Sequence, residues 1–202
     1  MTNKYTKQVK EIIFSHKPGW VFSHVDFAEV GNIATVERIL SRLLEEEKIS
    51  RIRRGLYYIP EHSRWGEVPP AQSEVVKALS RSMNTDFLLD GANALHKLGL
   101  TNQIPMKQVY LTDKQINTIS IGKVAIEFRK VSPKKLSGSN NRAGVYLSAI
   151  EYLGKNEAAQ ESMKMKVANI LNKDIAEELQ AASVNRSAWV REVVDEIVIR
   201  VA

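Results

Sequence analysis

The chain has 202 residues, of which 44% are hydrophobic and 26% charged, a composition typical of a globular protein rather than a disordered one. It contains no cysteine, which excludes disulfides, thiolate zinc sites, iron–sulfur clusters and cysteine nucleophiles. No stretch approaches the ~18–20 consecutive apolar residues that a membrane span requires. Because residues 1–10 are polar, we expect no secretory signal either, and a cytoplasmic protein is the natural expectation.

Positive charge is unevenly distributed along the chain. The formal net charge is +6, which is compatible with a polyanionic partner. Residues 97–142 hold 9 Lys and Arg against 2 Asp and Glu, and residues 1–65 hold 11 against 8. The excess therefore lies in a central block and, more mildly, in the N-terminal third.

The N-terminal third shows the element order of a winged helix-turn-helix. Apolar spacing predicts a helix over 4–14, and Trp20 to Phe22 can form a short strand. A second helix is expected over 24–30, followed by a turn at Gly31-Asn32, where we expect a positive φ at the glycine. A strongly amphipathic helix follows over 34–47. Two β-rich runs, 48–53 and 56–59, then flank Arg54-Gly55 as a hairpin. We expect residues 1–62 to form this domain.

In a winged helix-turn-helix the second helix of the motif enters the major groove. Arg38 and Arg42 lie one turn apart on the outward face of the third helix, and an arginine can bind guanine bidentately. The expected DNA-binding residues are Thr35, Arg38, Ser41 and Arg42 on the helix and Arg51, Arg53 and Arg54 on the wing. The alternatives are that these arginines only solvate a surface helix, or that the winged helix docks a protein.

The rest of the chain is predicted to be an α+β region followed by helices. Proline-rich residues 60–70 form the expected domain boundary. The pattern then predicts helices over 71–83 and 87–100, with Asp90 as a turn or cap residue and Gly99 as a C-cap, strands over 108–111, 118–121 and 124–128, and an exposed loop over 132–141. Helical periodicity returns over 143–153, 157–172, 174–183 and 186–200. The predicted fold class is α+β, with a second domain over 69–202 that ends in a helical tail over 143–202.

Chemistry-bearing motifs are scarce in this second part. The four histidines share no metal-ligand spacing, and no phosphate-binding glycine loop or nucleophile elbow occurs. We therefore expect no enzyme, no cofactor and no metal. The basic block forms either a second surface for nucleic acid or a scattered solvated face; its residues are Lys107, Lys114, Lys123, Arg129, Lys130, Lys134 and Lys135.

Two stretches resemble the AbiEi family of type IV antitoxins. One runs from Asp26-Phe27 through Arg42-Leu43 to Arg54-Gly55-Leu56-Tyr57-Tyr58-Ile59-Pro60, and is similar to the winged helix of that family. The other runs from Asp90-Gly91-Ala92-Asn93-Ala94-Leu95 to Ile104-Pro105 and Val109-Tyr110-Leu111-Thr112, and is similar to the start of its second domain. The tail after residue 142 has no such likeness.

The resemblance implies a repressor that binds inverted repeats of double-stranded DNA in its own promoter. It also implies an antitoxin that counteracts a nucleotidyltransferase-like toxin without forming a stable complex with it. Two other functions stay open. The chain can be a stand-alone winged-helix transcription factor whose C-terminal domain senses a ligand or mediates assembly, or it can be a protein-docking module.

Overall fold

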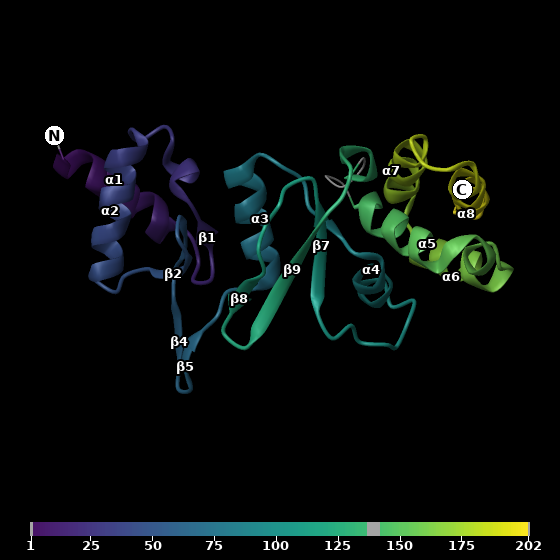
Figure 1. Cartoon of the computed structure of the whole chain (residues 1–202), viewed down its shortest axis with the longest axis horizontal. Coiled ribbons are helices and arrows are strands. Elements are labelled where there is room, and N and C mark those ends of the chain that lie inside the picture. Colours follow the sequence, from purple (N-terminus) through teal and green to yellow (C-terminus); the bar gives the residue numbers. More distant parts are fainter. Residues whose placement is uncertain (1, 137–141, 202) are drawn as a thin grey trace. The chain divides into compact units, whose positions relative to one another are not determined.

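The protein is a mixed α+β structure (Figure 1). A computed structural model describes residues 2–136 and 142–201. Its contacts divide the chain into two compact units. The first comprises residues Met1–Thr85 and Ile119–Ala125, and the second comprises Asp86–Thr118 and Ile126–Ala202. The expected boundary at residues 60–70 falls inside the first unit, and the assignment of functions to domains stays a prediction.

The first unit opens with helices around a small antiparallel sheet. The strands are ordered β1-β3-β2, with Val21 opposite Tyr58 and Arg51 opposite Tyr57. The elements are α1 (Thr2–Ser15), β1 (Val21–Phe22), the 3-10 helix η1 (His24–Phe27), α2 (Ile33–Glu45), β2 (Ser50–Arg53) and β3 (Leu56–Tyr58). Apolar side chains from α1, η1, α2 and the sheet share one core, in which Phe22, Phe27 and Leu40 are fully buried. The predicted helices at 4–14 and 34–47 and the predicted hairpin are confirmed.

Local hydrogen bonds explain where the helices of this region begin. Ser23 and Asp26 form a capping box at the start of η1, which satisfies two backbone amides that would otherwise lack a partner. The Asn32 side chain accepts a hydrogen bond of 2.9 Å from the Thr35 amide at the start of α2. The predicted second helix is shorter than expected, because helical structure ends at Phe27. Gly31 does not have the positive φ that we expected.

Four further elements belong to the first unit. A hairpin of β4 (Glu61–Ser63) and β5 (Gly66–Val68) follows the small sheet, and α3 (Gln72–Met83) comes next. Arg81 on α3 binds the Asp26 carboxylate at 2.6 Å and donates to the Val21 carbonyl oxygen at 2.9 Å, which ties α3 to η1 and β1. The last of the four, β8 (Ile119–Ile121), lies beside β2.

The second unit has a small sheet and a group of helices. Strand β7 pairs with β6 in antiparallel and with β9 in parallel orientation. The elements are β6 (Leu88–Leu89), α4 (Gly91–Lys97), β7 (Gln108–Thr112), β9 (Val124–Lys130, of which the first two residues belong to the first unit), the 3-10 helix η2 (Pro133–Leu136), α5 (Ala143–Ala158), α6 (Glu161–Ile170), α7 (Lys173–Ser183) and α8 (Ala188–Ile199). The predicted strands and the four C-terminal helices are confirmed. The predicted loop at 132–141 is described only as far as Leu136; residues 137–141 lie outside the described part of the chain.

The predicted helix over 87–100 is wrong in its first part. Residues Leu88–Leu89 pair with β7 as a strand, and the helix begins only at Gly91. Asp90 caps it by accepting a hydrogen bond of 3.2 Å from the Ala92 amide, and Gly99, with a φ of 69°, follows the C-cap Leu98. The expected role of Asp90 as a cap residue is therefore confirmed, whereas the C-cap that we expected at Gly99 lies one residue earlier, at Leu98.

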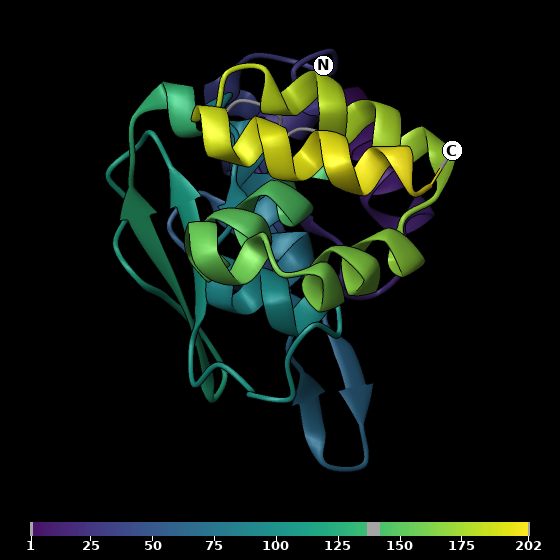
Figure 2. The same ribbon diagram turned by 90° about the vertical axis from the view of Figure 1, so that its right-hand side faces the viewer.

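Helices α5 to α8 pack around their own apolar core (Figure 2). Leu147, Leu179, Val194 and Ile197 are buried where these helices meet. In the part of the chain that the structure describes, no helix has the length and apolar character needed to cross a bilayer.

Candidate nucleic-acid interface

Helix α2 separates an apolar face from a polar one. Val36, Ile39, Leu40 and Leu43 are buried in the core of the first unit, so the opposite side of the helix faces solvent. This solvent-facing side carries Arg38, Ser41 and Arg42, all of them exposed, while Thr35 is half-buried near the start of the helix. Ile33, the first residue of α2, is 59% exposed.

The hairpin of β2 and β3 carries the second group of arginines. Along β2 the side chains alternate, so that Arg51 and Arg53 are exposed while the neighbouring Ser50 and Ile52 are half-buried. Arg54 is exposed at the turn, and Gly55 has a φ of 79°, a conformation that favours glycine. We call Arg51, Arg53 and Arg54 the ribbon arginines.

The arginines of α2 and of the hairpin have one property in common. No carboxylate of the described residues lies within 4.0 Å of the guanidinium groups of Arg38, Arg42 or the ribbon arginines. Five exposed arginines of one compact unit are thus free of salt bridges within the described structure, and their charge is available to an external anion. Arginine suits such a role, because its planar guanidinium binds phosphates and guanine edges bidentately.

The seven residues of the predicted second basic surface differ in both place and pairing. Lys123 belongs to the first unit and the other six to the second, so they do not form a single surface within one unit. Four of them pair with carboxylates: Lys107 with Glu127 at 2.5 Å, Lys114 with Asp113 at 3.6 Å, Arg129 with Asp90 at 3.4 Å and Lys135 with Glu151 at 3.6 Å. Lys123, Lys130 and Lys134 are exposed and form no salt bridge with a described residue. A nucleic-acid role for this set stays a prediction.

Two of these ion pairs border a cavity of the second unit that sequence reasoning missed. Its volume is about 350 Å³, and its walls come from β7, β9, η2, α4 and α5. Arg129 and Asp90 meet on one part of the wall, and Lys135 and Glu151 on another. Asp90 and Arg129 are 39 positions apart in the sequence, so their juxtaposition depends on tertiary packing and gives no local sequence signal.

The described residues contain no group of three or more His, Asp or Glu side chains that could hold a metal ion.

Comparison with other proteins assigns the α+β chain to a family. Residues 8–179 match a family of unknown function, DUF6088. Since the match covers most of the chain, the protein belongs to this family. A solved structure, that of the Rv2827c protein from Mycobacterium tuberculosis, is similar with a TM-score of 0.44 and 12% sequence identity; the match covers 98% of this chain and 77% of that one. No curated protein matches the chain.

Proposed function

We propose that the chain is a non-enzymatic DNA-binding autoregulator whose first unit contains a winged helix-turn-helix. The order helix, short helix, amphipathic helix and β-hairpin supports this interpretation. Helix α2 would enter the major groove, where Thr35, Arg38, Ser41 and Arg42 would contact base edges, while the ribbon arginines would contact the phosphate backbone or the minor groove. The observation that carries the proposal is the set of five exposed arginines on α2 and the hairpin, none of which pairs with a described carboxylate.

The second part of the proposal is an antitoxin role. It rests on the resemblance of residues 26–60 and 90–112 to the type IV antitoxins. The second unit would then counteract a nucleotidyltransferase-like toxin encoded by a neighbouring gene, without a stable complex. Expression of the neighbouring gene, alone and together with this chain, tests the role by cell growth. Growth arrest that this chain does not relieve would contradict it.

A second candidate function is favoured by the cavity of the second unit. A stand-alone transcription factor would use these 350 Å³ for a small ligand, since ligand pockets commonly have volumes of about 300–1,000 Å³. The mixed charges of its wall would suit a polar ligand. DNA binding that responds to a metabolite, in a genome without a neighbouring toxin gene, would favour this candidate over the antitoxin.

DNA binding is tested by titrating the chain against its own upstream DNA at several salt concentrations. Replacing Arg38 and Arg42 by Ala should weaken binding to the specific site by about 1–3 kcal/mol for each base that the arginine no longer reads. Replacing the ribbon arginines by Ala should weaken binding to all sequences and reduce the salt slope by about 1 for each phosphate that they bind.

Arg191→Ala is the matched control, because Arg191 is an exposed arginine of the second unit. It should leave both the affinity and the salt slope unchanged. An Arg38→Ala/Arg42→Ala variant with the affinity of the unmodified chain would contradict the assignment.

A further inference from the structure

The hairpin of β4 and β5 is an unusually exposed part of the first unit. All six strand residues are exposed, and the two strands pair only with each other. An isolated two-stranded hairpin is marginally stable in water, and both of its edges offer unpaired backbone groups. At its tip, the Trp65 side chain is 85% exposed. Figures 1 and 2 both show the hairpin projecting from the elements that flank it in the chain.

Two features give this hairpin a fixed position and a defined tip. Glu67, the central residue of β5, accepts hydrogen bonds from Ser50 on β2, at 3.0 Å, and from the Tyr58 hydroxyl on β3, which anchors the hairpin to the three-stranded sheet. At the tip, the Arg64 guanidinium lies 4.9 Å from the centre of the Trp65 ring, within the range of a cation–π contact. The hairpin therefore presents an indole and a positive charge together.

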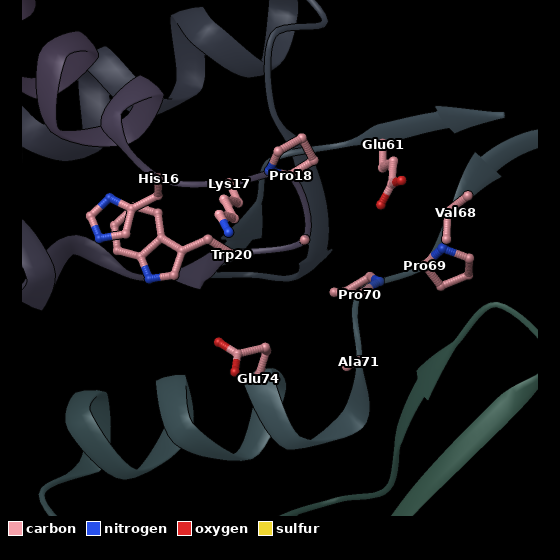
Figure 3. A pocket seen from close by; sticks show the side chains of 11 residues that line it. His16, Lys17, Pro18, Trp20, Glu61, Val68, Pro69, Pro70, Ala71 and Glu74 are labelled. Carbon is pink, nitrogen blue, oxygen red and sulfur yellow. The ribbon is translucent and has the colours of Figure 1, made fainter.

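A pocket of the same unit lies at the base of this hairpin (Figure 3). Its volume is about 460 Å³. One wall is apolar: the His16 ring stacks on Trp20 at 3.7 Å, and three prolines stand nearby, Pro18, Pro69 and Pro70. Figure 3 shows Glu61 and Glu74 on opposite sides of the opening.

One carboxylate of the pocket forms no salt bridge with a described residue. Two glutamates and one lysine, Lys17, line the pocket. Glu74 already pairs with Lys77 at 2.8 Å, whereas Glu61 forms no salt bridge with any residue that the structure describes. The pocket thus offers an apolar wall of stacked rings and prolines beside an uncompensated carboxylate. This is the chemistry that complements a paired indole and guanidinium.

We propose that two copies of the chain exchange their β4–β5 hairpins, so that Trp65 and Arg64 of each copy occupy the pocket at the hairpin base of the other. The dimensions agree with a reciprocal arrangement. The hairpin tip is three residues beyond Glu61, which is roughly 10 Å at the rise of a β-strand. Two hairpins lying antiparallel about a two-fold axis therefore place each tip beside the base of the other, and such isologous contacts close into a dimer.

Sedimentation equilibrium of the full chain without DNA, across the micromolar range, tests the dimer. Trp65→Ala should weaken dimerisation by about tenfold or more, as expected for a buried aromatic anchor. Met106→Ala is the matched control: Met106 is a fully exposed apolar side chain of the second unit, and its removal should change nothing. A chain that stays monomeric, or a dimer that Trp65→Ala leaves unchanged, would overturn the proposal.

A mixing experiment identifies the exchanged contact. Arg64→Glu and Glu61→Arg should each weaken the homodimer, because like charges then meet at both hairpin bases. A mixture of the two variants restores opposite charges at both contacts of the heterodimer, so heterodimers should form with an affinity close to that of the unmodified chain. Equal affinities of the mixed and unmixed variants would contradict the exchange.

The dimer does not depend on DNA binding, although two copies would suit an inverted repeat. The two proposals fail separately. A chain that dimerises through Trp65 but does not bind its upstream DNA would refute the proposed function alone. A chain that binds this DNA but does not dimerise would refute the hairpin exchange alone.

Discussion

At position 91, close packing leaves no room for a side chain. The backbone conformation of Gly91 does not itself require a glycine, because its φ is not positive. Gly91 is the first residue of α4 and lies against α5. A Cβ atom at this position would be 2.2 Å from the Cβ of Tyr152 and 2.8 Å from the carbonyl oxygen of Ser148. Neither atom is the end of a flexible side chain, so the two helices would have to move apart. Gly91 thus allows α4 and α5 to approach closely, and residues of both helices line the cavity of the second unit.

We expect Gly91→Ala to lower the free energy of unfolding by about 1–3 kcal/mol, the usual cost of overpacking. Urea unfolding followed by circular dichroism measures the change. Gly31→Ala is the control, because its Cβ would meet only the Tyr5 ring at 3.7 Å, an ordinary contact, and should be neutral or slightly stabilising. Equal stabilities of the two variants would show that α4 and α5 tolerate the extra atom.

At the scale of elements, the hydrogen bond from Tyr58 to Glu67, which anchors the β4–β5 hairpin, should make the stability of the protein depend on pH. Burial, and then the hydrogen bond and negative charge of Glu67, raise the pKa of Tyr58 to about 12. The pKa of a tyrosine in the unfolded chain is ~10. Because the pKa of Tyr58 is raised in the folded state, Tyr58 contributes fully to the free energy of unfolding below about pH 10. This contribution is lost as the pH rises towards 12.

Glu67→Gln should therefore move the tyrosinate absorbance transition of Tyr58 to lower pH, while burial keeps its pKa above 10. Tyr58→Phe assigns the transition, since it removes one of the six tyrosines and with it the corresponding absorbance change. A transition that Glu67→Gln leaves in place would mean that burial alone raises this pKa.

The elements differ in how far the sequence predicts them. Helix α2 and the hairpin of β2 and β3 follow from apolar periodicity and from Arg54-Gly55, since these signals lie within a few adjacent residues. The β4–β5 hairpin was missed, because none of its strand residues is buried and its pattern has no apolar alternation. The strand β6 was predicted as helix, because two leucines suit either structure and only pairing with β7 decides between them.

For the candidate site, the exposure of the arginines could be predicted from the sequence, but their lack of partners could not. The exposure of Arg38, Arg42 and the ribbon arginines follows from their places on an amphipathic helix and an alternating strand. Their lack of carboxylate partners among the described residues depends on tertiary packing and could not be inferred from the sequence. The same holds for the pocket at the hairpin base, which brings residues 16–20 to residues 61–74.

At the scale of the whole molecule, the chain passes between the two compact units three times, after residues 85, 118 and 125. The first unit therefore includes β8, which comes more than 30 residues after its main segment. Ile119 and Ile121 of this strand are buried, and β8 lies beside β2. The first unit is therefore not continuous in the sequence. Cutting the chain after Thr85 removes β8 and with it part of the first unit.

A fragment of residues 1–85 should consequently be less stable than the same unit in the full chain. Burial of an isoleucine contributes about 1.5–3 kcal/mol, so the loss of both corresponds to roughly 3–6 kcal/mol. Native-state hydrogen exchange of the β2 and β3 amides measures the difference. The full chain with Ile119→Ala and Ile121→Ala is the control, because it keeps the connection but removes the side chains, and its protection should fall towards that of the fragment. If the fragment protects β2 and β3 as well as the full chain does, β8 does not contribute to the stability of the first unit.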